Sequence, residues 1–112
     1  MSFNRKKIGE LELVTLSGRF DTETAQRVET DFDKLTSGGG SNTVVDMAGV
    51  DYVSSSMIRV LLKSLKRHRA AKGDLQLAAL QPQILKVIKI AGMDALFTIH
   101  ETREKALESV SK

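Results

Sequence analysis

The sequence predicts an α/β fold in which a mixed, mostly parallel β-sheet packs against about four α-helices. Short alternating or β-branched apolar segments take turns along the chain with segments whose apolar residues recur at helical spacing. Turn-forming residues separate these segments, and helices between successive strands favour parallel, right-handed crossovers. The chain has 112 residues, the size of one domain, so we expect residues 1–112 to form a single domain with one core.

Two strands and a helix are expected in the first third of the chain. Residues 11–16 alternate apolar with polar side chains, as a strand does, and residues 3–8 indicate a preceding strand across a glycine turn. Residues 21–24 place capping and acidic side chains where a helix begins, and that helix should end before the glycines at 38–40. Its apolar stripe consists of Ala25, Val28, Phe32 and Leu35.

The middle of the chain predicts a buried strand followed by a second helix. Residues 43–47 form a β-branched apolar run typical of a buried strand, and residues 48–53 are expected to form a connection. The next helix follows the serines at 54–56 and should end near residues 72–74, where glycine allows a turn. The expected apolar face of this helix comprises Ile58, Leu61, Leu62 and Leu65.

The last third predicts two more strands and two more helices. Leu75, Leu77 and Ala79 indicate a strand, and Pro82 suits the first turn of a third helix. Residues 96–99 are expected to form a short final strand, and residues 102–110 a terminal helix. The buried stripe expected for the third helix comprises Ile84, Val87, Ile88 and Ala91.

The composition is that of a soluble cytoplasmic protein. Hydrophobic residues make up 41% of the chain and charged residues 28%, and there is no cysteine, so disulfides and thiolate chemistry are excluded. No apolar stretch approaches the roughly 18 residues needed to span a bilayer. The charged beginning of the chain has no apolar run behind it, which argues against a signal peptide. We therefore expect neither membrane insertion nor secretion.

Charge is distributed unevenly along the chain, although the net charge is only +3. Acidic residues crowd the segment 21–33, and the segment 59–72 carries only basic charges. The basic segment could steer an acidic partner or nucleic acid, or it could simply be a solvated helix face. Aromatic residues make up only 4% of the chain and offer few platforms for base stacking, so direct nucleic-acid binding is not expected.

The residue pattern does not predict an enzyme, a cofactor site or a metal site. His68 and His100 lack the spacing of metal ligands; we expect His68 to be a solvated side chain and His100 to end the last strand. No Gly-x-Ser-x-Gly elbow surrounds the serines. The glycines at 38–40 lack a following Gly-Lys-Ser/Thr and precede a strand, so they predict a helix-to-strand turn rather than a phosphate loop.

The serine run Ser54, Ser55 and Ser56 stands directly before the second helix. Serine is among the best helix N-caps because its hydroxyl accepts a hydrogen bond from an unpaired backbone N–H. One serine suffices for that role, and a helix N-terminus also favours a phosphate group. The residues alone therefore leave two interpretations open, capping only and regulatory phosphorylation.

A wider pattern resembles the STAS domains of the anti-sigma factor antagonist family. Residues 44–62 resemble its signature, in which a buried strand ends in Asp-Leu-Ser-Gly-Val and leads to an Asp-Ser-Ser-Gly-Leu helix start. Residues 16–21 resemble the family's Leu-x-Gly-x-Leu-Asp. Residues 73–77 and 90–97 resemble a later strand and the Thr-Gly-Leu-x-x-Leu-Phe segment. The resemblance covers nearly the whole chain in order.

The resemblance implies partner switching. In such proteins the second serine of Asp-Ser-Ser-Gly is phosphorylated by an anti-sigma factor that is also a serine kinase, and a PP2C-type phosphatase removes the phosphate. The unphosphorylated form binds the kinase and frees a sigma factor. The matching acceptor in this chain is Ser56, with Ser55 as the fallback. The expected partner-binding residues are Asp21, Ser54, Ser55, Ser56, Met57 and Arg59.

Two residues depart from the family pattern. Ser54 replaces the family aspartate, which removes a negative charge beside the acceptor, and Met57 replaces the family glycine and adds apolar bulk. These changes leave a second reading open, a scaffold or transporter-associated binding module of the same fold in which the serines only cap the helix. Oligomeric state is not predicted.

Overall fold

Five strands lie side by side in sequence order in the computed structural model, which describes residues 1–37 and 42–110. β1 runs antiparallel to β2, and the other neighbouring strands are parallel. The predicted mixed, mostly parallel sheet is therefore confirmed. The strands are β1 (Ser2–Ile8), β2 (Leu11–Phe20), β3 (Asn42–Val53), β4 (Asp74–Ala78) and β5 (Ile99–His100).

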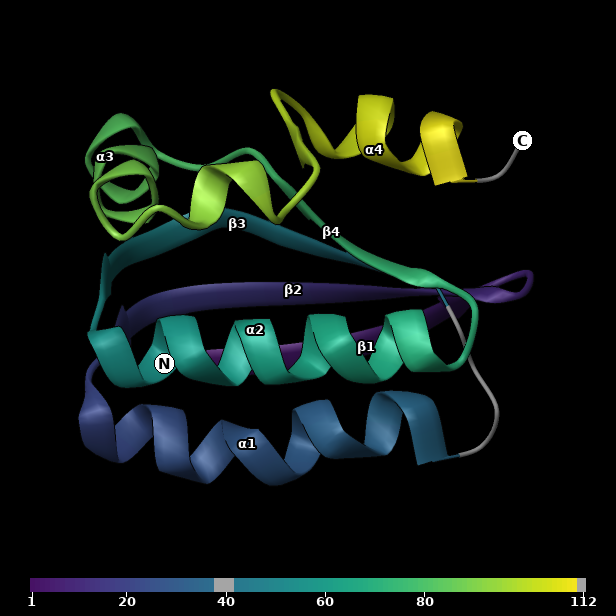
Figure 1. Ribbon diagram of the computed structural model, residues 1–112, viewed down its shortest axis with the longest axis horizontal. Helices are drawn as coiled ribbons and strands as arrows, with labels where there is room; N and C mark the ends of the chain where they lie inside the picture. Colours follow the sequence, from purple (N-terminus) through teal and green to yellow (C-terminus); the bar gives the residue numbers. More distant parts are fainter. Residues whose placement is uncertain (38–41, 111–112) are drawn as a thin grey trace.

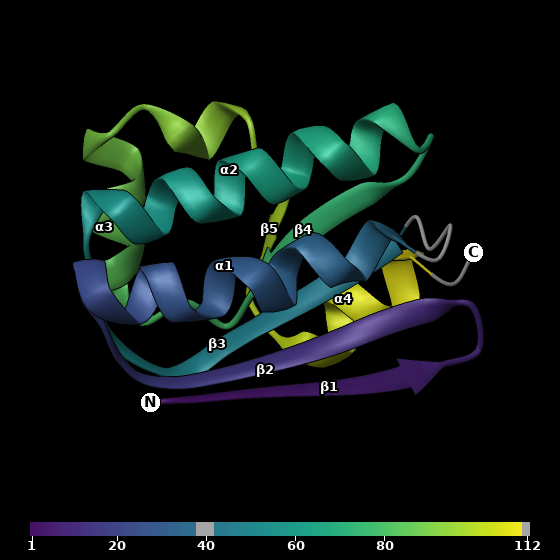
Figure 2. The same cartoon turned by 90° about the horizontal axis from the view of Figure 1, so that it is seen from below.

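Residues 1–37 and 42–110 form four α-helices that pack against this sheet, as predicted. α1 and α2 lie side by side on one face of the sheet, and α4 lies on the opposite face (Figures 1 and 2). A short 3₁₀-helix, η1, follows α3. The helices are α1 (Thr22–Ser37), α2 (Ser55–Ala70), α3 (Pro82–Ile90), η1 (Met93–Ala95) and α4 (Arg103–Val110).

The main core lies between the sheet and helices α1, α2 and α3. All four residues of the apolar stripe predicted for α1 are buried. In α2, Ile58, Leu61 and Leu65 are buried, and Leu62 packs at the margin. A smaller apolar cluster joins the other face of the sheet to α4 through Ala106. Apolar clusters therefore pack helices against both faces of the sheet.

β2 and β3 are longer than the sequence predicted. Residues 48–53 were expected to form a connection, but they continue β3 beside the end of β2. Two irregularities in the pairing, between Thr15 and Ser17 and between Gly18 and Arg19, let the strands stay in register. Val50 and Val53 are buried and anchor the extension to the main core. Both strands therefore reach the same end of the molecule.

The last third also differs from the prediction. Val87 is 37% exposed and Ala91 is exposed, so the stripe of α3 is narrower than expected. Of the final strand predicted at residues 96–99, only Ile99 belongs to β5; Leu96 caps the 3₁₀-helix η1, and residues 97 and 98 lie between η1 and the strand. His100 ends β5, as predicted. The prediction for the glycines at 38–40 lies outside the described residues.

His68 is fully buried near the end of α2, which contradicts the prediction of a solvated side chain. One ring nitrogen lies 2.8 Å from the Thr43 hydroxyl on β3, and the other lies 2.7 Å from the Ser64 carbonyl one helical turn earlier. The ring thus satisfies polar groups of two elements at once. The basic character of its neighbours in sequence concealed this inward position.

This position makes the free energy of unfolding depend on pH. Burial lowers the pKa of the His68 imidazole below its ordinary value of 6.5, although the Ser64 carbonyl and Asp74 oppose the shift. The unfolded chain therefore binds a proton near pH 6.5 before the folded chain does, and stability falls as pH drops through that value. We expect urea denaturation to give a lower free energy of unfolding at pH 5.5 than at pH 7.5. His68→Gln, which cannot titrate, should flatten this dependence; an unchanged slope would contradict the assignment to His68.

Candidate functional site at the start of helix α2

The serine run lies at the end of the sheet where β2 and β3 finish and α1 and α2 begin (Figure 1). The backbone N–H of Ser54 donates to the carbonyl of Phe20, the last residue of β2, at 2.8 Å. Because parallel strands bring their carboxyl ends to one edge, the starts of the two following helices become neighbours. The serine run and the start of α1 thus share one surface.

Ser54 is the N-cap of α2. Its backbone is extended, with φ −86° and ψ 166°, and its hydroxyl accepts a hydrogen bond from the Met57 backbone N–H at 3.2 Å. An aspartate would cap the helix in the same way but would add a negative charge. Serine in place of the family aspartate therefore keeps the cap and leaves the first turn of α2 without an acidic residue.

Since Ser54 performs the capping, the hydroxyls of Ser55 and Ser56 are not needed for it. Ser55 is exposed, and within residues 1–37 and 42–110 its hydroxyl has no hydrogen-bond partner. Ser56 is half-buried: its hydroxyl donates to the Thr22 hydroxyl at 3.4 Å and accepts from Arg59 Nη2 at 3.2 Å. Ser56 is thus the serine that the surrounding side chains orient.

Asp21 caps the neighbouring helix α1. Its carboxylate accepts a hydrogen bond from the Thr24 backbone N–H at 2.9 Å, and this bond lowers the pKa of the carboxyl. The residues on either side of Asp21 both contact the serine run: Phe20 accepts from Ser54, and Thr22 contacts Ser56. The structure therefore places Asp21 at the same end of the molecule as Ser56.

Met57 has a different position from the one expected of a partner-binding residue. Its side chain is fully buried in the main core, so it offers no surface to a partner. It faces inward because the helix turns by about 100° per residue and places it on the apolar face with Leu61. The buried methionine side chain thus packs the start of α2 against the main core.

An arginine and a tyrosine near this end were missed by the sequence interpretation. Arg19 and Tyr52 are paired across β2 and β3, and the guanidinium carbon of Arg19 lies 3.9 Å from the centre of the Tyr52 ring. Tyr52 remains 38% exposed. The pair exists only because β3 continues past residue 47, and no sequence signal indicated that continuation.

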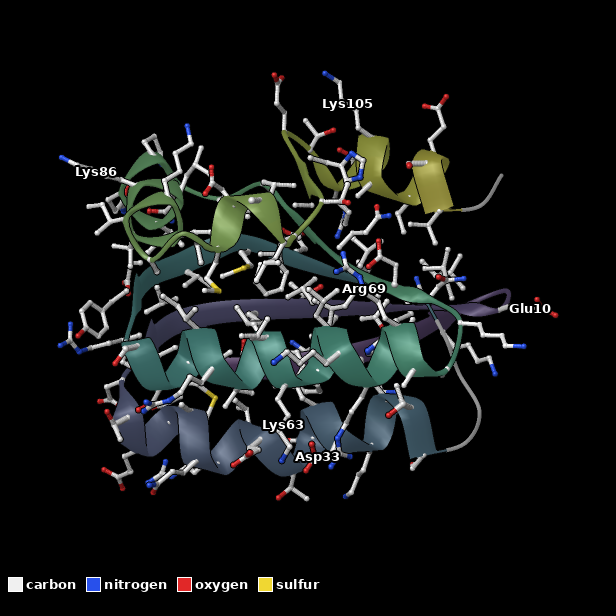
Figure 3. All side chains as sticks on the ribbon, viewed as in Figure 1. Glu10, Asp33, Lys63, Arg69, Lys86 and Lys105 are labelled. Carbon is white, nitrogen blue, oxygen red and sulfur yellow. The ribbon has the colours of Figure 1, made fainter. Side chains whose placement is uncertain are left out.

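A groove of about 710 Å³ runs between α1 and α2, with Ser56 and Arg59 among its lining residues. The acidic and basic segments of the sequence meet across it. Lys63 Nζ lies 2.9 Å from a Glu29 carboxylate oxygen and 3.7 Å from one of Asp33 (Figure 3). Arg67 also lies 3.6 Å from Asp33. Part of the charge of the basic segment 59–72 is therefore neutralised within the chain. Each exposed ion pair contributes only about 0–1 kcal/mol to the free energy of unfolding.

Residues 1–37 and 42–110 contain no group of three or more His, Cys, Asp or Glu side chains that could hold a metal ion. Among the same residues, no helix is long and apolar enough to cross a membrane. The side chains that contact the serine run or cap the helix beside it offer the hydroxyl of Thr22, the carboxylate of Asp21 and the guanidinium of Arg59. Such groups serve recognition and phosphate binding.

Comparison with known proteins identifies the fold and the family. The STAS domain model matches residues 2–106. BtrV of Bordetella bronchiseptica, whose proposed role is that of an anti-sigma factor antagonist, is 29% identical over 106 residues, covering 95% of this chain and 91% of BtrV. A Thermotoga maritima protein with the same proposed role has a similar crystal structure, with a TM-score of 0.91 at 19% identity over 98% of this chain and 95% of that one.

The phosphorylated form of the Bacillus cell fate determinant SpoIIAA also shares the fold. It superimposes with a TM-score of 0.77 at 18% identity, covering 97% of this chain and 99% of SpoIIAA. The sheet order and the helix starts beside the serine run agree with the family resemblance seen in the sequence. The chain belongs to the STAS domain family.

Proposed function

We propose that this protein is a cytoplasmic, non-enzymatic anti-sigma factor antagonist that works by partner switching. In its unphosphorylated form it binds an anti-sigma factor that is also a serine kinase. Phosphorylation of Ser56 by that kinase releases it, and a PP2C-type phosphatase restores the binding form. The proposed binding surface comprises Asp21, Ser54, Ser55, Ser56 and Arg59, and Met57 supports it from the core.

One observation carries this proposal: Ser54 caps α2, which leaves the Ser56 hydroxyl at the surface between Thr22 and Arg59. Phosphorylation of a capping serine would remove the hydroxyl that caps the helix. Phosphorylation of Ser56 leaves the cap intact, because Ser54 supplies it. Two similar proteins support the proposal in part: the role proposed for BtrV is that of an anti-sigma factor antagonist, and SpoIIAA exists in a phosphorylated form.

The switch follows from charge. A phosphoserine carries about −1.5 to −2 charges near neutral pH, and it would stand where the first turn of α2 now has no acid. That charge repels acidic groups of a partner that fits the unmodified surface. It also replaces the hydroxyl contact that a partner makes with Ser56. Neither effect requires the fold to change.

Copurification from the native cell tests this proposal. We expect the wild-type chain and Ser56→Ala to retain a serine kinase, and Ser56→Asp to lose it, because aspartate introduces the negative charge. Ser109→Asp is the matched control, since it makes the same change at an exposed serine of α4, outside the proposed binding surface, and should leave kinase binding unchanged. Peptide mass spectrometry of the wild type should find phosphate on Ser56.

Equal kinase binding by the wild type, Ser56→Ala and Ser56→Asp would rule out switching at Ser56. A phosphate found on Ser55 would move the acceptor to the fallback position. Absence of any phosphopeptide covering residues 54–56 would favour the second reading, in which the domain is a scaffold or transporter-associated module and its serines only cap the helix.

A further inference from the structure

The guanidinium of Arg59 is in direct contact with the proposed acceptor oxygen. Arg59 Nη2 donates to Ser56 Oγ at 3.2 Å, and the two residues are three positions apart on α2, where side chains share one helix face. Phosphorylation adds the phosphate to this same oxygen. Its terminal oxygens would therefore extend into the space that the Arg59 guanidinium already borders.

Arg59 is also available for a new partner. Within residues 1–37 and 42–110, Lys63 and Arg67 pair with carboxylates of α1, and Arg69 lies 3.6 Å from Asp74. Over the same residues, Arg59 has no carboxylate partner, and its side chain is exposed. A phosphate on Ser56 would not have to displace an existing ion pair to reach it.

Other groups at the site favour an anion in the same place. The Thr22 hydroxyl lies 3.4 Å from Ser56 Oγ and can donate to a phosphate oxygen. Ser56 stands in the first turn of α2, where unpaired backbone N–H groups carry partial positive charge. Ser54 adds no opposing charge, in contrast to the aspartate that the family resemblance leads one to expect there.

We propose that Arg59 is a positioning residue that binds the phosphate on Ser56 within the same chain. The guanidinium presents parallel N–H donors that match two phosphate oxygens, which an ammonium group cannot do. The pair would hold the phosphate against α2 and favour its doubly charged form. The inference rests on the proposed function, since it takes Ser56 as the acceptor.

Phosphorus NMR of chains carrying phosphoserine at position 56, installed during protein synthesis, tests the inference without any kinase. A cation beside the phosphate lowers its second pKa, which is about 6 in the absence of such a partner. We expect Arg59→Ala to lower the second acid dissociation constant of the phosphate roughly two- to fivefold at low salt. A change of this size corresponds to the loss of one exposed ion pair. Arg59→Lys should recover part of the loss.

Lys66→Ala is the matched control, because Lys66 lines the same groove and is exposed but has no contact with Ser56 in the described residues. It should leave the phosphate titration unchanged, and salt should reduce the difference between wild type and Arg59→Ala. Equal titration curves for wild type and Arg59→Ala, or equal shifts in the two alanine variants, would overturn the inference. Because the phosphate is supplied synthetically, this outcome is independent of whether a kinase modifies Ser56 in the cell.

Discussion

Met57→Gly is expected to lower the free energy of unfolding by about 3–5 kcal/mol, although glycine is the residue that the family resemblance places there. Met57 is fully buried among the core residues of the main cluster. Removal of its side chain leaves a cavity that neighbouring side chains fill only in part. Glycine adds a backbone cost, because it loses more conformational freedom in a helix than other residues. Urea denaturation monitored by circular dichroism measures the change.

Met57→Leu is the control for that experiment, since it conserves volume and should cost less than about 1.5 kcal/mol. A loss below about 1 kcal/mol for Met57→Gly would show that the core closes around the missing side chain. In that case Met57 would not support the start of α2, and the glycine of the family pattern would be interchangeable with it.

Phe32→Ala is expected to cost about 3–5 kcal/mol. Phe32 is 1% exposed, and its ring meets that of Phe3 edge to face, with centres 5.2 Å apart and planes at 77°. The pair joins α1 to the edge strand β1, so the substitution removes buried area and an aromatic contact together. Thermal or urea unfolding gives the measurement.

Thr30→Ala serves as the control on the same helix, because Thr30 is exposed and a surface substitution of this kind changes stability by about 0.5 kcal/mol or less. Similar values for the two variants would contradict the central position assigned to Phe32. A large loss for Phe32→Ala alone supports the packing of α1 on the sheet.

The order of strands and helices could be predicted from the sequence because an element that buries one face repeats its apolar residues at the spacing of a helix or a strand. The stripe of α1 illustrates this, since each of its four apolar residues is buried. The patterns failed where pairing between distant segments decided the outcome. Residues 48–53 contain glycine and exposed polar positions, and only the partner strand β2 makes them a strand. His68 looked solvated because its inward orientation depends on Thr43, which is 25 residues away.

The position of the serine run at a helix start could be predicted, but not its contacts. The serines directly before an amphipathic helix indicated a cap, and Ser54 is that cap. The sequence alone did not show which serine would face Thr22 on α1, or that Arg59 would reach back to Ser56. Those contacts depend on the packing of two helices that begin at neighbouring strand ends. Met57 was listed among the expected partner-binding residues because the resemblance aligns it with the family glycine after the serine pair, but its side chain is buried in the core.

The hydrogen bond from Ser54 to Phe20 has a further consequence for binding. It ties the junction before α2 to the end of β2, so the serine run belongs to the framework rather than to a free loop. Docking of the proposed partner here would order no segment of this chain, so this chain would lose little conformational entropy on binding. The surface is pre-organised, so in the proposed switch a phosphate on Ser56 would alter the shape and charge of a fixed surface that cannot rearrange to accommodate it.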